Sequence, residues 1–313
     1  MLSRQREKDL YKQGYRITGS NFAIKVCMWT KRAIKNEDFC YKQKFYGINS
    51  HRCVQMTPAM QFCNHRCCWC WRDIDFTEPK WKGKADDPKD IIEKCIKEHV
   101  RYLHGFGGNP KTNKEKYKEA FKPLHFAISL SGEPTFYPKL PELISELRKR
   151  KITSFLVSNG TNPSMLRKMI KNQPTQLYIT LPAPDEETYT KVCAPLIQNG
   201  WKKINESLSL LKKFERSAIR LTLVKEVNMV KLEKYAKLIK KASPLFVEVK
   251  AYMHVGYSQQ RLPLKAMPRH EEVKEFAEQI AKFSGYKIID EKENSRVVLL
   301  MKKDSKKRII KIR

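Results

Sequence analysis

The sequence has 313 residues, of which 41% are hydrophobic and 31% are charged, which predicts a soluble globular protein with a sizeable core. No apolar run approaches the ~18 residues that a membrane helix needs. The polar N-terminus also lacks the apolar segment of a signal peptide, so we expect a cytoplasmic protein without a membrane partner. The chain has 63 Lys and Arg against 33 Asp and Glu, which gives a net charge of +30. Such a charge favours nucleic acid as a partner. The alternatives are an anionic membrane surface and a basic protein that binds no polyanion.

The first part of the chain is basic, aromatic and only weakly periodic. We expect residues 1–53 to form an N-terminal extension that carries cysteines, and residues 54–313 to form the main domain with a basic tail. A short strand at 54–61 leads directly into a cysteine-rich loop at 62–71. The first clear helix begins at Pro88, because proline suits the first turn of a helix and an aspartate precedes it as a cap.

Short apolar runs and helical patterns alternate through the rest of the chain, after a glycine-rich basic segment that we predict to be a mobile loop, 105–118. Strands are expected at 125–130, 154–157, 176–181, 219–224 and 246–251. Helices are expected at 139–149, 164–171, 201–214 and 230–240, and the chain ends with a helix at 269–283 and a strand at 297–301. This alternation predicts parallel βαβ units. The fold class is therefore α/β, a partial or full (β/α) barrel, with a doubly wound open sheet as the alternative.

The cysteines are concentrated in one region, since seven of the nine lie between residues 27 and 70. An odd number of cysteines without a secretion signal argues against disulfides and for a metal site. The loop CNHRCCWC places Cys63, Cys67 and Cys70 at the spacing C-x3-C-x2-C. Three thiolates on a tight loop suit three irons of a cubic 4Fe–4S cluster and leave the fourth iron open. Zinc is the alternative, although structural zinc needs four ligands and only Cys67 and Cys70 have its usual spacing.

This spacing, placed after a first strand, resembles the motif of the radical S-adenosylmethionine superfamily. The resemblance implies that the open iron binds the methionine part of S-adenosylmethionine (SAM), and that the reduced cluster cleaves it to a 5′-deoxyadenosyl radical. The segment SLSGEPT at 129–135 resembles the GGEP motif of that superfamily, which contacts the methionine amino group. Ser131 replaces its first glycine, whereas Gly132, Glu133 and Pro134 match.

Other polar residues at predicted strand ends fit the same cofactor pocket, with ordinary strand-end polarity as the alternative. They are Ser158, Asn159, Thr180, Arg220 and Thr222. His65, inside the cysteine loop, is expected either to hydrogen-bond a cluster sulfide or to face solvent. We assign no role to Cys68 or Cys193, and we expect Cys95 to be a packing residue.

A second group of cysteines lies in the N-terminal extension. Cys27, Cys40 and Cys53 are spaced 13 residues apart. Their position beside an iron–sulfur loop suggests a second 4Fe–4S cluster, again with three ligands and one open iron.

The wider resemblance is to the tRNA 4-demethylwyosine synthases, the wyosine-base enzymes of archaea and eukaryotes. The matching stretches are Cys27, CYK at 40–42, Cys53, CNHRCCWC, SLSGEPT, FLVSNGT at 155–161 and VEVKAYMHVG at 247–256. Eukaryotic members carry an additional flavodoxin-like domain. The chain resembles the archaeal type, which implies an external one-electron donor such as ferredoxin or flavodoxin.

The resemblance implies a radical SAM lyase that joins N1-methylguanosine at position 37 of tRNA-Phe to pyruvate and forms the tricyclic base 4-demethylwyosine. Lys42 fits the family lysine proposed to hold pyruvate as a Schiff base. Lys44 is a close rival, and the open iron of the second cluster is another candidate for binding pyruvate. We expect a monomer. Another radical SAM enzyme with a different nucleic-acid or protein substrate, and a non-catalytic zinc protein that binds RNA, are the alternatives.

Several aromatic residues are candidates for stacking on an RNA base, and the basic segments 105–118 and 302–313 for holding the RNA backbone. The aromatic candidates are Trp29, Tyr41, Phe45, Tyr46, Trp69, Trp71, Trp81 and Tyr252.

Overall fold

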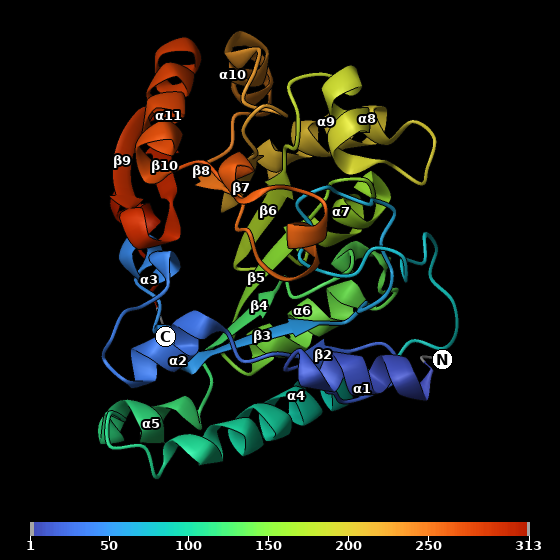
Figure 1. Cartoon of the computed structure of the whole chain (residues 1–313), viewed down its shortest axis with the longest axis vertical. Coiled ribbons are helices and arrows are strands. Elements are labelled where there is room, and N and C mark those ends of the chain that lie inside the picture. The colour runs from blue at the N-terminus through green and yellow to red at the C-terminus, as the bar shows by residue number, and fades with distance from the viewer. Residues whose placement is uncertain (1–2, 312–313) are drawn as a thin grey trace. The chain divides into compact units, whose positions relative to one another are not determined.

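The chain forms two compact units in the computed structural model, which describes residues 3–311 (Figure 1). Unit 1 consists of Met1–Gln61, Trp81–Leu156 and Ile309–Arg313, and unit 2 of Phe62–Lys80 and Val157–Arg308. Among the described helices, none is both long enough and apolar enough to cross a membrane.

The strands of unit 1 lie side by side in the same order as in the sequence, and they form both antiparallel and parallel pairs. They are β1 (Arg16–Ile17), β2 (Ala23–Ile24), β3 (Cys53–Thr57), β4 (His125–Ile128) and β5 (Thr153–Ser158), whose last two residues belong to unit 2. β1, β2 and β3 are antiparallel, and β3, β4 and β5 are parallel. The β3–β4–β5 core is mostly apolar, as expected for parallel strands that are buried on both faces.

The helices of unit 1 are α1 (Arg4–Lys12), α2 (Met28–Ile34), α3 (Tyr41–Tyr46), α4 (Pro88–Leu103), α5 (Lys114–Ala120) and α6 (Leu140–Lys149). α4 begins where the sequence predicts, because the Asp87 carboxylate accepts hydrogen bonds from the backbone N–H groups of Lys89 and Asp90. This helix packs against β2, β3 and α6.

Unit 2 continues the alternation of strands and helices. Its strands lie in the order β6 (Gln176–Thr180), β7 (Ser217–Leu223), β8 (Phe246–Ala251), β10 (Val297–Met301) and β9 (Lys287–Lys292). The first three are parallel, and β10 is antiparallel to both β8 and β9. The helices are α7 (Pro163–Met169), α8 (Glu186–Cys193), α9 (Gly200–Leu210), α10 (Leu232–Ala242) and α11 (His270–Ser284). α7 contacts α9, α9 contacts α10, and α10 contacts α11, so these helices form a continuous row (Figure 1).

The predicted α/β class is confirmed, and the barrel is partial. Among the described residues, β1 and β9 are edge strands with one hydrogen-bonded neighbour each. The predicted division at residue 53 stays a prediction, although residues 3–53 belong to the same compact unit as β3 and β4.

The expectation of a loop throughout 105–118 is wrong for its last five residues. α5 begins at Lys114, and the side chain of Asn113 caps it by accepting the N–H of Lys116 at 2.9 Å. Tyr117 and Phe121 pack on a buried cluster that includes Leu103, and this apolar face stabilises a helix in an otherwise polar segment.

Candidate active site

The cysteine loop in unit 2 has no regular secondary structure and is held by a few backbone hydrogen bonds. The N–H of Cys63 donates to the carbonyl of Glu78 at 2.9 Å, and that of Cys70 donates to the carbonyl of Cys67 at 3.0 Å. Cys63, Cys67 and Cys70 are half-buried thiols outside any disulfide among the described residues. The loop therefore brings three half-buried cysteines into one short segment of the chain.

The same loop runs antiparallel along the C-terminal end of α8. His65 forms a bridge with Pro195. The flanking backbone bonds are Leu196 N–H to Asn64 O at 2.9 Å, Arg66 N–H to Cys193 O at 2.8 Å, and Cys68 N–H to Val192 O at 2.9 Å. Because α8 and these bonds fix the loop on both sides of Cys67, the position of that thiol is set by a distant segment of the chain.

Asn159, predicted from its place after β5, lies against the cysteine loop. Its side-chain N–H donates to Asn64 Oδ1 at 2.9 Å and to Cys63 Sγ at 3.9 Å. Thr161, which was not predicted, accepts a hydrogen bond from the Asn64 amide at 2.8 Å. The FLVSNGT segment thus supports the cysteine loop through Asn159 and Thr161.

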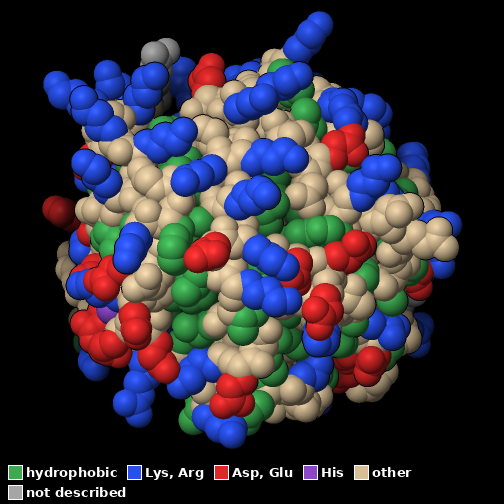
Figure 2. Space-filling view, turned by 90° about the horizontal axis from the view of Figure 1, so that it is seen from above, with side chains coloured by type: hydrophobic (Ala, Val, Ile, Leu, Met, Phe, Trp, Pro, Cys, Tyr) green, Lys and Arg blue, Asp and Glu red, His purple; other side chains and the backbone are tan. Residues whose placement is uncertain are grey.

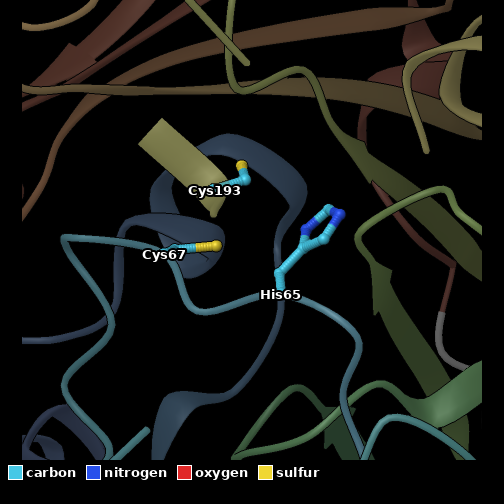
Figure 3. A group of neighbouring side chains, drawn as sticks. All are labelled: His65, Cys67 and Cys193. Carbon is cyan, nitrogen blue, oxygen red and sulfur yellow. The ribbon is translucent and has the colours of Figure 1, made fainter. Parts of the chain in front are cut away.

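His65, Cys67 and Cys193 come together beside the loop (Figure 3). Their ligand atoms lie within 4.8 Å of one another, and His65 and Cys193 are buried. His65 does not face solvent, because its Nε2 is hydrogen-bonded to the hydroxyl of Tyr189 at 2.8 Å. A hydrogen bond with Cys193, together with burial, raises the pKa of Cys67 well above its usual range.

The loop thiols fit an iron–sulfur cubane better than a single metal ion. A cubane takes each ligand on a different iron, whereas one zinc ion draws all its ligands to a single point. Among the described residues, the ligand atoms that lie close enough to share one ion are those of His65, Cys67 and Cys193, and not those of the three loop cysteines. Iron would displace the thiol protons, which offsets the cost of burying these thiolates.

The GEP segment in unit 1 is rigid. Thr57 Oγ1 donates to the carbonyl of Ser131 at 2.6 Å, and Ser131 Oγ donates to the carbonyl of Met60 at 3.3 Å. Gly132 has a φ of 68°, a left-handed conformation that favours glycine. The buried Glu133 carboxylate accepts the N–H and the hydroxyl of Thr135 at 3.1 and 2.6 Å. Glu133 and Pro134 thus shape the turn, and their carbonyls accept the N–H groups of Phe136 and Tyr137 at 3.0 Å each.

The other strand-end residues in unit 2 divide into two kinds. Ser158 is buried and accepts the N–H of Gly160 at 3.0 Å, so its hydroxyl supports a turn. Thr180 and Thr222 are half-buried at the ends of β6 and β7. Their cofactor contacts remain predictions.

Arg220 belongs to an ion pair that the sequence analysis missed. Its Nε and Nη2 donate to Oε2 of Glu248 at 3.0 and 2.9 Å, and its guanidinium lies 4.5 Å from the ring centroid of Tyr178. The Glu248 side chain is fully buried. A glutamate inside the apolar run at 246–251 was the available signal, because a buried carboxylate needs a partner.

Unit 1 brings the N-terminal cysteines into one neighbourhood. Cys27 precedes α2, Cys40 precedes α3, and Cys53 opens β3. Burial raises the pKa of Cys53 to about 12, with Lys42 opposing that shift and Cys40 and Cys27 adding to it. Burial also raises the pKa of Cys27, again opposed by Lys42. Three thiols and one lysine therefore interact within this part of unit 1.

Burial distinguishes the two candidate lysines. Lys42 is 7% exposed and its Nζ lies 4.8 Å from the ring centroid of Phe155, whereas Lys44 is exposed. A Schiff-base lysine must be neutral, and burial disfavours the charged form of an amine. The geometry thus favours Lys42.

The stacking candidates separate by exposure. Tyr41, Phe45, Tyr46 and Tyr252 are buried core residues, as is Cys95. The half-buried candidates are Trp29, Trp69, Trp71 and Trp81. Cys68 packs with Trp69 against a buried cluster around Tyr252, as expected for a cysteine without a ligand role.

Comparison with known proteins defines the family. Residues 114–239 match the family described as the radical SAM superfamily, and residues 241–302 match the one described as wyosine base formation. Over 298 residues the chain is 50% identical to the S-adenosyl-L-methionine-dependent tRNA 4-demethylwyosine synthase of Pyrococcus abyssi, covering 94% of this chain and 87% of that protein. The chain belongs to the tRNA 4-demethylwyosine synthase family.

Solved structures of the same kind agree with this membership. A structure of TYW1 with a lysine–pyruvate adduct bound aligns with a TM-score of 0.88 and 38% identity, covering 99% of this chain and 98% of that one. The crystal structure of an archaeal TYW1 aligns with a TM-score of 0.79 and 36% identity, covering 96% and 97%. As a demethylwyosine synthase family member, the chain is a radical SAM enzyme whose cofactors are SAM and a 4Fe–4S cluster. The zinc-protein alternative is thereby excluded.

Proposed function

We propose that this chain condenses N1-methylguanosine at position 37 of tRNA-Phe with pyruvate to form 4-demethylwyosine. The observation that carries the proposal is the buried Lys42, which interacts with Cys53 beside Cys27 and Cys40, in a chain that is 50% identical to a named synthase. The lysine–pyruvate adduct named for the similar solved structure supports the same assignment.

In this proposal the loop thiolates of Cys63, Cys67 and Cys70 hold the SAM cluster. When bound and reduced, that cluster with SAM supplies a 5′-deoxyadenosyl radical, which takes one hydrogen atom from the N1-methyl group of the guanosine. The backbone of the GEP segment orients the methionine part, and Asn159 orients the loop through its bonds to Asn64 and Cys63. The remaining strand-end residues contact the rest of the cofactor: Ser158, Thr180, Arg220 and Thr222.

Lys42 holds the second substrate. Its neutral amine attacks the keto carbon of pyruvate and expels water, which gives a Schiff base. The methylene radical of the base bonds to that carbon and leaves the unpaired electron on the Lys42 nitrogen. Homolysis of the C1–C2 bond of pyruvate then restores the C=N bond, and the carboxyl group leaves as a one-carbon fragment that carries the unpaired electron. The exocyclic amine of the guanine then displaces the Lys42 nitrogen, which closes the third ring and regenerates the lysine.

Cys27, Cys40 and Cys53 are the proposed ligands of a second 4Fe–4S cluster. Their mutual charge interactions and their shared interaction with Lys42 support this assignment. A cluster at this place would stand beside the lysine and hold the pyruvate carboxylate near the reacting carbon.

The charge of the molecule suits tRNA as the substrate. Lys and Arg side chains cover much of the face shown in Figure 2, as expected from a net charge of +30. Each phosphate that these side chains neutralise would release counterions from the RNA. The proposal includes a cytoplasmic location, where tRNA is modified, an external one-electron donor such as ferredoxin or flavodoxin, and a monomeric enzyme.

The test is a product assay under anaerobic conditions. Reconstituted protein receives SAM, a strong reductant, carbon-13-labelled pyruvate and tRNA-Phe methylated at N1 of guanosine 37. We expect a modified nucleoside that contains two labelled carbons, and no product from tRNA with unmethylated guanosine 37. Release of 5′-deoxyadenosine without a labelled nucleoside would refute the proposed substrates and favour another radical SAM reaction.

A further inference from the structure

Cys193 is a buried thiol to which the proposed reaction gives no task. It is the last residue of α8 and is 1% exposed. Its Sγ, the Sγ of Cys67 and the imidazole of His65 lie within 4.8 Å of one another (Figure 3). Cys193 is therefore a direct neighbour of a proposed cluster ligand.

The proximity of the two thiols is fixed by the backbone. The N–H groups of Arg66 and Cys68, on either side of Cys67, donate to the carbonyls of Cys193 and Val192 at 2.8 and 2.9 Å. One turn earlier in α8, Tyr189 bonds to His65, and the two ring centroids are 5.4 Å apart. A rotation of one side chain thus cannot separate α8 from the cysteine loop.

We infer that Cys193 is a positioning residue, whose thiol donates a hydrogen bond to the sulfur of Cys67 when Cys67 holds iron and so raises the reduction potential of the SAM cluster. This inference rests on the proposed ligand role of Cys67.

The direction of the hydrogen bond follows from the chemistry of the pair. The Sγ atoms of Cys193 and Cys67 lie within 4.8 Å of one another, and the backbone bonds of Arg66 and Cys68 to α8 keep them there. Iron binds the thiolate form, so a ligated Cys67 carries no proton and can only accept a hydrogen bond. The hydrogen in the pair then belongs to Cys193.

The effect on the potential follows from charge. Reduction adds negative charge to the cluster and its ligand sulfurs, and a hydrogen-bond donor to such a sulfur stabilises the more negative state. The burial of Cys193 keeps this donor away from competing water. A cluster with this donor is easier to reduce than one without it.

The test compares two substitutions at one site in the reconstituted holoenzyme. Cys193→Val keeps the volume and removes the donor, whereas Cys193→Ser keeps a donor. The midpoint potential is measured by electron paramagnetic resonance in a redox titration without tRNA or pyruvate, together with iron and sulfide content. Cys95→Val, at another fully buried cysteine, is the matched control.

We expect Cys193→Val to shift the midpoint to a more negative potential, Cys193→Ser to recover part of that shift, and Cys95→Val to match the wild type. A wild-type potential for Cys193→Val, equal shifts for both variants, or loss of iron in both would overturn the inference. Cys67→Ala separates this result from failure of the proposed ligand set. Unchanged iron in that variant refutes the ligand role itself, whereas iron loss there without an effect of Cys193→Val refutes only the inference.

Discussion

The ion pair between Arg220 and Glu248 offers the most direct test of how unit 2 is stabilised. Glu248→Ala removes a fully buried carboxylate and leaves the guanidinium of Arg220, whose side chain is 15% exposed, without that partner. Breaking a buried pair by removing one partner costs about 3–5 kcal/mol. Because Arg220 retains some contact with water, we expect a loss near the lower end, ~3 kcal/mol.

This loss can be measured by thermal unfolding followed by circular dichroism. A domain of the size of unit 2 loses roughly 2–4 °C in Tm per kcal/mol, so the variant should melt roughly 6–12 °C below the wild type. The control is Glu187→Ala, because Glu187 is 66% exposed in its pairs with Lys191 and Lys231, and an exposed pair contributes at most about 1 kcal/mol. The double variant Arg220→Met, Glu248→Leu should recover most of the loss, because an apolar pair leaves no buried charge. Equal Tm changes for Glu248→Ala and Glu187→Ala would refute this reasoning.

Three further predictions concern unit 1. Borohydride reduces a Schiff base, so treatment in the presence of pyruvate should add mass to the peptide that contains Lys42. Lys42→Arg should abolish this adduct, and Lys44→Arg should retain it. The reverse result would make the exposed Lys44 the site. Substituting Cys27, Cys40 or Cys53 by Ala should remove about half of the bound iron, as expected if two 4Fe–4S clusters are present, whereas Cys95→Ala should remove none; full iron in all three variants would reject the second cluster. Burial lowers the pKa of His99 to about 4, so this histidine is neutral in the folded state and binds a proton in the unfolded state below about pH 6.5. The free energy of unfolding should therefore fall as the pH drops from about 6.5 to 4, by up to ~3 kcal/mol from His99. His99→Leu should weaken the dependence of the urea midpoint on pH, whereas His104→Leu, at an exposed histidine, should not. Equal slopes in both variants would contradict the assignment.

The parallel strands could be predicted because each is a short apolar run that is buried on both faces. β10 has the predicted bounds, Val297–Met301, and β8 spans Phe246–Ala251 as expected. α8 was missed because its eight residues are too few to show a clear helical pattern of apolar residues. Nothing in the sequence of α8 indicates that its C-terminal end lies against the cysteine loop. The nearness of Cys193 to Cys67 could not be read from the sequence, since it depends on how segments far apart in the chain come together.

The choice between Lys42 and Lys44, by contrast, had a signal in the sequence. In α3, Tyr41, Lys42, Phe45 and Tyr46 are buried, which is the spacing of one helix face. A lysine on the same face as three aromatic residues is unlike the solvated lysines elsewhere in this basic chain. Helical periodicity therefore places Lys42 on the buried face, even in a helix of six residues.

The support of the cysteine loop by α8 has a consequence for how this protein tolerates change. The loop takes its shape from the backbone of residues 192–196, which carry none of the proposed cluster ligands. Lengthening or shortening the chain by one residue between Asp185, which caps α8, and Leu196 would shift the carbonyls that receive the loop's N–H groups. Iron binding should thus be sensitive to insertions at a place where every cysteine of the CNHRCCWC loop is left intact.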